Sequence, residues 1–324
     1  MNAQPRISVI IPARNAEATM EECLASLEQL DYSRERLEVI IINDGSTDNT
    51  KSIINKYVAR NPHFICLDTE AVGPGKARNM GISRATGEYV AFADADCALD
   101  SRWLEELLAG FINGSIAGVG GSQRAPQNAT PFEEEVHAFL TSIRFVGEYI
   151  KLGEKLRPAG HLSSCNSMYR KAVVDSVGGF DEELWPGEDV DLDYRITRQG
   201  YKLMFNPRAA VRHHRPRDLR GFFRMMVRYG CANMDLIKKH GFFRRLQLVP
   251  VLEVFLLAGW AVLLAFYLYI GIALALAILL GAATAFALKH GWKRGLNNLK
   301  LLIITLVAFS IGNALCLFSR GRRS

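Results

Sequence analysis

The sequence of 324 residues contains only six cysteines, and no two of them form a C-x-x-C pair. This spacing favours neither a disulfide scaffold nor a zinc site, so we expect reduced thiols, either cytosolic or buried in a membrane. A signal peptide is lacking as well, because Met1–Arg6 is polar and the first apolar run, Ile7–Ile11, is short. We therefore expect the N-terminal part of the chain to stay in the cytosol.

Charged residues are nearly absent from two stretches near the C-terminus. Glu253 is the only one between Leu246 and Leu288, and Leu301–Ser319 has none. Because about 20 helical residues, at ~1.5 Å each, cross ~30 Å of hydrocarbon, such stretches can span a membrane. We assign residues 247–324 to a transmembrane region of two to three spans. The predicted spans are residues 248–270, 271–288 and 301–319, the last being a full span or a re-entrant segment.

The net charge of the chain is +6, and much of the excess of Lys and Arg lies after Arg195. This placement favours membrane lipids over nucleic acid as the partner of the basic region. Arg220, Arg224 and Arg228 recur every four residues, and Phe222 lies on a different, apolar face of the same helical pattern. We expect residues 216–246 to form a basic amphipathic segment in the membrane interface. Packing of this helix against the preceding domain is the alternative.

The first part of the chain alternates between apolar strands and amphipathic helices. The predicted strands are Ile7–Ile11, Leu37–Ile42 and Phe64–Leu67, and the helices are Ala16–Leu30 and Thr50–Arg60. This alternation predicts an α/β fold with a mostly parallel sheet. The first turn between strand and helix, Pro12–Asn15, lacks the G-x-G-x-x-G fingerprint, which disfavours a nicotinamide dehydrogenase.

The stretch Tyr89–Cys97, YVAFADADC, combines a buried strand with two carboxylates. Asp94 and Asp96 follow the apolar run, at the carboxyl end of the strand, where ligands bind to open α/β sheets. Two neighbouring carboxylates repel each other unless a positive charge lies between them. Hard oxygen ligands suit Mg²⁺ or Mn²⁺, which often bridge the phosphates of a nucleotide. An acidic turn without a ligand is the alternative.

A glycine-rich stretch, GPGKARN at Gly73–Asn79, precedes this strand. Its glycines allow a close approach of the backbone, and Lys76 and Arg78 could face phosphates or a base. Most Gly-Pro-Gly runs are simple turns, so this signal alone is weak. Around it we predict a helix at Asn79–Ala85, and later a polar loop at Val119–Pro131 and a helix at Phe132–Tyr149.

Four acids occur within the six residues from Glu188 to Asp193, at the start of a helical pattern. They could supply a general base, a carboxylate held near an acceptor hydroxyl. The alternative is ordinary acidic charge in a first helical turn. Further on, His213 and His214 end a short strand. A histidine pair in a basic segment is usually surface decoration, and it gains importance only if one ring faces a metal.

Seven stretches, in their order and spacing, resemble the family-2 glycosyltransferases with the GT-A fold. They cover about residues 6–215, and we assign residues 1–215 to a GT-A (Rossmann-like) catalytic domain. The stretches are VIIPARN (Val9–Asn15), NDGSTD (Asn43–Asp48), GPGKARNMG (Gly73–Gly81), DAD (Asp94–Asp96), GGFDE (Gly178–Glu182), GEDVDLDYR (Gly187–Arg195) and the Val211-x-His213 segment.

The resemblance implies a site for a nucleotide-sugar donor. The implied nucleotide contacts are Asp44, which would hydrogen-bond the nucleobase (typically uracil), Pro12, Arg14 and Arg78. Asp94 and Asp96 resemble the D-x-D pair that holds Mg²⁺ or Mn²⁺ on the diphosphate. His213, rather than His214, resembles the late histidine of such sites that approaches the metal or the diphosphate.

On the acceptor side, Asp189 resembles the catalytic base and Glu188 a residue that supports acceptor binding. With one base and no nucleophile on the opposite face, displacement of the diphosphate would invert the anomeric carbon. Processive members of the family carry Q-x-x-R-W after the catalytic acid. The best alignment here, Met225–Tyr229, has neither the glutamine nor the tryptophan. This departure favours transfer of a single sugar.

The resemblance therefore implies a multi-pass membrane enzyme of the hexosyltransferase type, with a cytoplasmic catalytic domain. It would pass a sugar from a nucleotide-diphosphate sugar, with UDP-sugars favoured, to a lipid-linked or polysaccharide acceptor. The layout is similar to that of succinoglycan-type and lipid-linked-oligosaccharide transferases. Two alternatives stay open: a polyprenyl-phosphate sugar synthase, in which a lipid phosphate attacks the donor, and a non-catalytic nucleotide-sugar-binding membrane subunit.

Overall fold

The computed structural model describes residues 4–143 and 155–317, and the chain divides into two compact units. The sheet unit comprises residues 1–129 and 140–215. The helical unit comprises residues 130–139 and 216–324.

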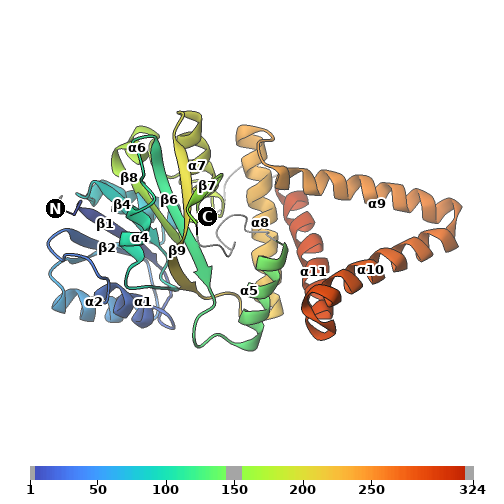
Figure 1. Ribbon diagram of the computed structural model, residues 1–324, viewed down its shortest axis with the longest axis horizontal. Coiled ribbons are helices and arrows are strands. Elements are labelled where there is room, and N and C mark those ends of the chain that lie inside the picture. The colour runs from blue at the N-terminus through green and yellow to red at the C-terminus, as the bar shows by residue number, and fades with distance from the viewer. Residues whose placement is uncertain (1–3, 144–154, 318–324) are drawn as a thin grey trace. The chain divides into compact units, whose positions relative to one another are not determined.

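The described residues of the sheet unit form one nine-stranded mixed sheet (Figure 1). Its strand order is β3-β2-β1-β4-β8-β6-β9-β5, and β7 pairs with β9. Strands β1 to β4 run parallel to their neighbours within this group, and β8 is antiparallel to both β4 and β6. The bounds are β1 (Ile7–Ala13), β2 (Leu37–Asp44), β3 (Phe64–Thr69), β4 (Tyr89–Ala93), β5 (Cys97–Leu99), β6 (Ile116–Arg124), β7 (Arg157–Ala159), β8 (Asn166–Arg170) and β9 (Lys202–His213). The predicted α/β fold is confirmed.

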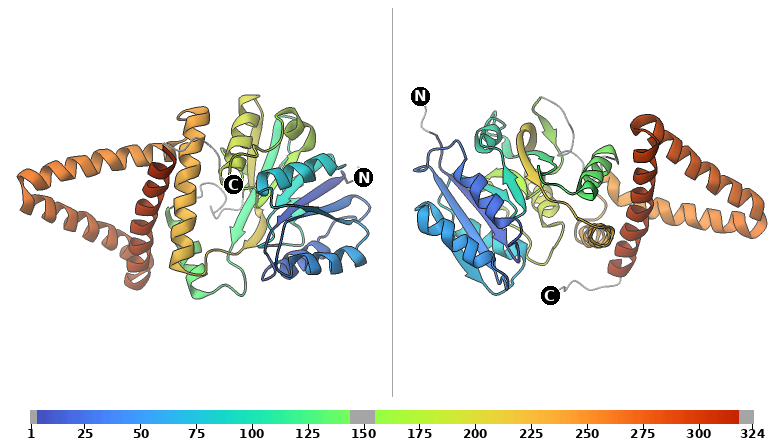
Figure 2. Two further views of the ribbon diagram at one scale, coloured as in Figure 1. Left: turned by 180° about the vertical axis from the view of Figure 1, so that it is seen from behind. Right: turned by 90° about the horizontal axis from the view of Figure 1, so that it is seen from below.

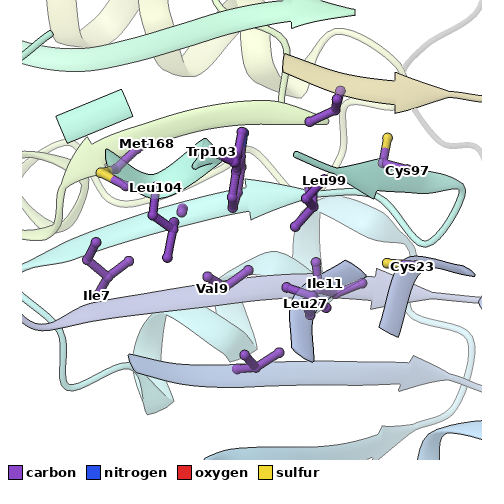
Figure 3. Close-up of a cluster of buried hydrophobic side chains, with 14 of the residues drawn as sticks. Ile7, Val9, Ile11, Cys23, Leu27, Cys97, Leu99, Trp103, Leu104 and Met168 are labelled. Carbon is purple, nitrogen blue, oxygen red and sulfur yellow. The ribbon is translucent and has the colours of Figure 1, made fainter. Parts of the chain in front are cut away.

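Helices cover both faces of this sheet, because its central strands are apolar on both sides. In β1, Ile7, Val9 and Ile11 pack on one face with side chains of α1 and α4, as Figure 3 shows, whereas Ile10 packs on the other face. Residues of α3, α6 and α7 lie in the second cluster. The helices are α1 (Met20–Glu28), α2 (Thr50–Arg60), α3 (Pro74–Arg84), α4 (Trp103–Leu108), α6 (Lys171–Ser176) and α7 (Glu188–Arg198).

Among the predicted segments that differ from the structure, two lie at glycine-rich stretches. Residues 119–124 belong to β6 and not to a polar loop. Glycine is a poor strand former, but here it lets strands approach: a Cβ added to Gly121 would lie 1.7 Å from the carbonyl oxygen of Ala209. The helix predicted from Asn79 instead starts at Pro74, so most of the Gly-Pro-Gly stretch forms the first turn of α3. Proline suits this position because the first helical N–H has no partner within the helix.

The helical unit holds four long helices in the described part of the chain, and Figure 2 shows α8 and α11 side by side. The two backbones approach closely, since a Cβ on Gly230 would lie 2.0 Å from Phe309 O and one on Gly312 would lie 2.0 Å from Val227 O. The bounds are α5 (Pro131–Ile143), α8 (Leu219–His240), the 3₁₀ turn η1 (Arg245–Leu248), α9 (Val249–Phe266), α10 (Leu268–His290) and α11 (Trp292–Leu317). The part of the predicted Phe132–Tyr149 helix after residue 143 lies outside the described residues.

Two sequence predictions about this unit are modified. A disulfide joins Cys231 of α8 to Cys316 of α11, so the expectation of reduced thiols is wrong for this pair. The apolar face of α8 is covered by protein: Phe222 is fully buried and its ring contacts that of Phe139. Arg220, Arg224 and Arg228 are exposed at intervals of four residues, as the amphipathic pattern predicts.

Two of the C-terminal helices are candidate membrane spans. Residues Leu268–Ala285 of α10 and Arg294–Leu317 of α11 have mean hydropathies of 2.2 and 2.0. They overlap the predicted spans 271–288 and 301–319, although residues 318 and 319 lie outside the described part. The first predicted span, 248–270, corresponds to α9, which ends at Phe266.

Candidate active site

The carboxyl ends of three parallel strands bring most of the predicted donor-site residues to one edge of the sheet. Strands β2, β1 and β4 are neighbours, and Pro12 in β1 lies opposite Ile42 in β2. Asp44 ends β2, and Asp94 follows β4 directly. Arg14 comes directly after β1 and is exposed. This edge is the place where open α/β sheets bind ligands.

Asp44 organises the loop that leads into α3. Its side chain is 3% exposed, and its two carboxylate oxygens accept hydrogen bonds from the backbone N–H groups of Val72 (2.6 Å) and Gly73 (3.0 Å). A carboxylate has about four lone pairs, so these two bonds leave capacity for a further donor. The predicted nucleobase contact of Asp44 would use that capacity, and it stays a prediction.

Arg78 connects Asp94 to the start of α7. Its guanidinium is 3% exposed and donates from Nη2 to Asp94 Oδ1 (2.6 Å) and from Nη1 to Glu188 Oε1 (2.8 Å). A buried cation is tolerated when it is paired and hydrogen-bonded, and two carboxylates meet that condition here. Arg78 thereby holds Asp94 and Glu188 in one cluster, although they lie 16 and 110 positions away from it in the sequence.

Asp94, Asp96 and His213 form a group suited to a cation. One ligand atom from each lies within 4.8 Å of the other two, and His213 Nε2 lies 3.4 Å from Asp96 Oδ1. The pairing of β5 with β9 places His213 beside Cys97, one residue after Asp96. The two aspartate side chains are 32% and 44% exposed, so a ligand can reach them. Two carboxylates and an imidazole match the preferences of Mg²⁺ and Mn²⁺.

The pKa values of this cluster reflect its burial and its paired charges. Burial raises the pKa of Asp94 to about 6, although Arg78 opposes the shift. Burial likewise raises the pKa of Glu188 to about 7. The positive charge of Arg78 lowers this pKa, and the negative charge of Asp189 raises it further. His213 behaves differently: burial alone would lower its pKa, but the negative charge of Asp96 raises it to about 10. Perturbed groups of this kind gather at functional sites more often than elsewhere.

Asp189 and Glu188 lie side by side in the first turn of α7, after Gly187 with φ +111°. Asp189 Oδ2 accepts a hydrogen bond from the backbone N–H of Ser164 (3.3 Å), and the side chain is 18% exposed. Glu188 is more deeply buried, and within the described residues its Oε2 has no hydrogen-bond partner. Such an oxygen is expected to find a partner, which a bound acceptor could supply.

A short series of contacts links Asp96 to Asp189. Asp96 contacts His213 through Nε2, and His213 Nδ1 lies 3.7 Å from the sulfur of Cys165. The residue before Cys165 is Ser164, which binds Asp189. Ser164 and Cys165, just before β8, thus connect the surroundings of His213 to those of Asp189.

Sequence reasoning missed a buried histidine beside the predicted base. His161 Nδ1 is 2.7 Å from Asp193 Oδ2, and His161 Nε2 is 3.9 Å from Asp189 Oδ2. Asp193 is further held by the Leu162 N–H (2.6 Å) and the Tyr169 hydroxyl (2.8 Å). The signal was the fourth acid of the GEDVDLD stretch, because a carboxylate one helical turn after Asp189 faces the same side of α7.

It also missed the surroundings of His213. Gln123 Oε1 lies 2.9 Å from His213 Nδ1 and accepts a hydrogen bond from Arg215 Nη2 (2.6 Å). Cys97 and Cys165 are buried next to the same ring. These residues come from β6, β5 and the segment before β8, so no local motif joins them.

Comparisons with known proteins find a matching family and several relatives. Residues 8–178 match the model of Glycosyl transferase family 2. The probable glycosyltransferase YdaM of Bacillus subtilis (strain 168) is 25% identical over 246 residues, which cover 74% of this chain and 58% of that protein. Glycosyltransferase AglE of Haloferax volcanii is 29% identical over 203 residues, covering 62% of this chain and 64% of that protein. The chain thus spans roughly three fifths of the length of these curated relatives.

A solved structure with the same fold covers nearly the whole chain. The mannosyltransferase PcManGT from Pyrobaculum calidifontis, determined in complex with GDP-Man and Mn²⁺, superposes with a TM-score of 0.68 at 21% sequence identity. The match covers 97% of this chain and 88% of PcManGT. The GT-A fold expected from the sequence is confirmed.

Proposed function

The chain belongs to glycosyl transferase family 2, and we propose that it transfers a single sugar, with inversion, from a nucleotide-diphosphate sugar to a lipid-linked or polysaccharide acceptor. A UDP-sugar is the favoured donor, and the sheet unit works at the cytoplasmic face of a membrane. The observation that carries this proposal is the double ion pair of Arg78. It holds Asp94, on the donor side, and Glu188, beside the predicted base Asp189, in one site.

On the donor side, Asp94, Asp96 and His213 would hold a divalent cation, Mg²⁺ or Mn²⁺. When bound, the ion supplies positive charge that stabilises the diphosphate leaving group. Gln123 supports this arrangement: Gln123 Oε1 would accept the Nδ1–H of His213, and Nε2, which faces Asp96, would bind the ion once the ion displaces its proton. Pro12, Arg14 and Asp44 would contact the nucleotide at the adjoining strand ends.

On the acceptor side, Asp189 would take the proton of the acceptor hydroxyl. The hydroxyl oxygen then forms a bond to the anomeric carbon, while the bond from that carbon to the diphosphate breaks and its electron pair leaves with the phosphate oxygen. Ser164 fixes one oxygen of Asp189, and Arg78 fixes Glu188 for acceptor binding. A single attack from the face opposite the leaving group inverts the anomeric centre.

The substitution Asp189→Asn tests this function. Transfer of labelled sugar from a panel of nucleotide sugars to membrane extract should fall by about 10²–10⁴-fold, because the asparagine cannot accept the proton. Donor binding should persist, because Asp189 lies on the acceptor side. The control is Asp175→Asn, an exposed carboxylate of α6 paired with Lys171, which should keep full activity.

Three results would count against the proposal. Normal turnover of Asp189→Asn would show that Asp189 is not the catalytic base. A mild loss would favour a polyprenyl-phosphate sugar synthase, because a phosphate nucleophile needs little help from a base. Absence of transfer by the wild-type chain with every donor, together with intact donor binding, would favour a non-catalytic subunit.

A further inference from the structure

A second group of metal-binding side chains lies directly beside the acidic one. Cys97 and Cys165 are buried, at 1% and 2% exposure, and His213 belongs to both groups. One ligand atom from each of Cys97, Cys165 and His213 lies within 4.8 Å of the other two. The three residues come from β5, the segment before β8, and β9, so the folded sheet assembles a group that the cysteine spacing could not indicate.

The distance between Cys165 and His213 fits two ligands of one tetrahedral ion. With Zn–S and Zn–N bonds of ~2.3 and ~2.0 Å, neighbouring ligand atoms on one zinc ion are about 3.5–3.8 Å apart. The sulfur of Cys165 lies 3.7 Å from His213 Nδ1, and the hydroxyl of Ser163 lies 3.2 Å from the same sulfur as a possible fourth ligand. Thiolate and imidazole ligands select zinc-like ions, whereas paired carboxylates select Mg²⁺ or Mn²⁺.

The two nitrogens of His213 face the two groups separately. Nε2 faces Asp96 at 3.4 Å, and Nδ1 faces Cys165 at 3.7 Å. In a neutral ring coordinated through Nδ1, the proton resides on Nε2, which then donates to Asp96 and cannot bind a metal. Gln123 would lose its bond to Nδ1 but would keep Arg215 as a donor at 2.6 Å.

We propose that Cys97, Cys165 and His213 Nδ1 bind one soft divalent cation of the Zn²⁺ class, with release of the two thiol protons. This ion and the hard cation of the acidic group compete for His213, so zinc-class ions inhibit the enzyme. The first part of the proposal concerns metal binding alone and stands or falls without any measurement of transfer.

Cadmium, a spectroscopic substitute for zinc, tests the binding site in the full chain under reducing conditions. We expect one Cd²⁺ per chain with thiolate-to-cadmium charge-transfer absorption. The absorption should be lost in Cys97→Ser and in Cys165→Ser, and retained in Cys66→Ser. Cys66 is a matched control because it is a free, half-buried thiol of β3, at the opposite edge of the sheet. Circular dichroism checks that each variant is folded.

Lack of thiolate absorption in the wild type, or full absorption in a folded Cys165→Ser variant, would overturn the proposal. If the cysteine variants do not fold, ¹¹³Cd NMR of the wild-type chain decides, because a shift typical of oxygen and nitrogen ligands alone would exclude this site. Competition between the two ions is measured separately, by following Mn²⁺ binding through electron paramagnetic resonance. One equivalent of Zn²⁺ should weaken Mn²⁺ binding to the wild type but not to Cys165→Ser, and equal weakening of both would refute the sharing of His213.

Discussion

At the scale of single residues, the site depends on a cation that the protein itself supplies. Arg78 is buried and pairs with Glu188, which is also buried, and with Asp94, which is 32% exposed; partial removal from water raises the pKa of both carboxyl groups. Removal of the guanidinium would leave two carboxylates facing each other in a poorly hydrated place. Buried ion pairs are costly to break for this reason, even when forming them adds little stability.

The substitution Arg78→Ala should therefore lower the free energy of unfolding by about 3–5 kcal/mol. Thermal unfolding of the purified chain in detergent measures the loss as a drop in melting temperature. The matched control is Arg60→Ala, which removes an exposed arginine from its ion pair with Glu28 and should change stability little. Equal effects of the two substitutions would contradict the structural role of Arg78.

Glu188 should make stability depend on pH. Its pKa is about 7 in the folded protein, against an ordinary value of 4.5, so between these values the folded state holds more protons than the unfolded state. Stability contributed in this way is present at low pH and is lost as the pH rises through that window. The melting temperature of the wild type should thus fall more steeply than that of Glu188→Gln between about pH 5 and about pH 8. Parallel profiles would show that Glu188 does not titrate there.

At the scale of elements, periodicity predicted the strands and helices that carry apolar residues. Strands β1, β2, β3 and β4 appear where the apolar runs are, with ends that differ by two residues or fewer. Residues 119–124 of β6 were predicted as part of a loop because Gly120 and Gly121 carry no side chain to signal burial. In the sheet, neighbouring atoms lie so close to these glycines that a Cβ would clash with them, and the sequence alone does not show this.

The same distinction separates the parts of the site that could be predicted from those that could not. Asp94, Asp96 and Asp189 follow recognisable local patterns, and the parallel strands β2, β1 and β4 place Asp94 at the same edge of the sheet as Asp44. His161 and Cys165 lie in the segment before β8, where no periodic pattern in the sequence indicates their contacts. Their positions depend on strand pairing between distant parts of the chain, which composition and spacing do not encode.

Gly121→Ala tests the account of β6. The added Cβ would lie 1.7 Å from Ala209 O, so β9 must move, and overpacking of this kind costs roughly 1–3 kcal/mol or more. Gly114→Ala is the control, because nothing lies within 4 Å of its added Cβ and its φ is not positive. The melting temperature should fall markedly in the first variant and stay nearly constant in the second. Unchanged stability of Gly121→Ala would contradict the close pairing of β6 with β9.

At the scale of the whole molecule, a sheet unit with a polar site is combined with a helical unit that exposes apolar side chains. In α10, Leu276, Ile278 and Leu280 are each more than 60% exposed, which is uncommon for a helix in contact with water. This exposure supports the proposal of membrane insertion. Helix α8 would attach to a membrane differently, because its exposed arginines would bind the charged surface of the bilayer.

These two modes of attachment respond differently to salt. High salt screens surface charges and would release a chain held by α8 alone. A chain that spans the bilayer through α10 and α11 should stay in the membrane fraction in high salt and in alkaline carbonate, and should be released only by detergent. Fractionation followed by immunoblotting measures this directly. Release by salt would contradict the proposed spans.

We propose that Asp94, Asp96 and His213 form a metal-assisted donor site. Its most direct test is the melting temperature of the full chain with nucleoside diphosphates, with and without Mn²⁺, because a ligand that binds only the folded state raises this temperature. We predict that UDP raises it only together with Mn²⁺ or Mg²⁺, and that Asp96→Asn abolishes the shift. A shift of the same size without metal or in Asp96→Asn, or no shift with any nucleoside diphosphate, would contradict the account.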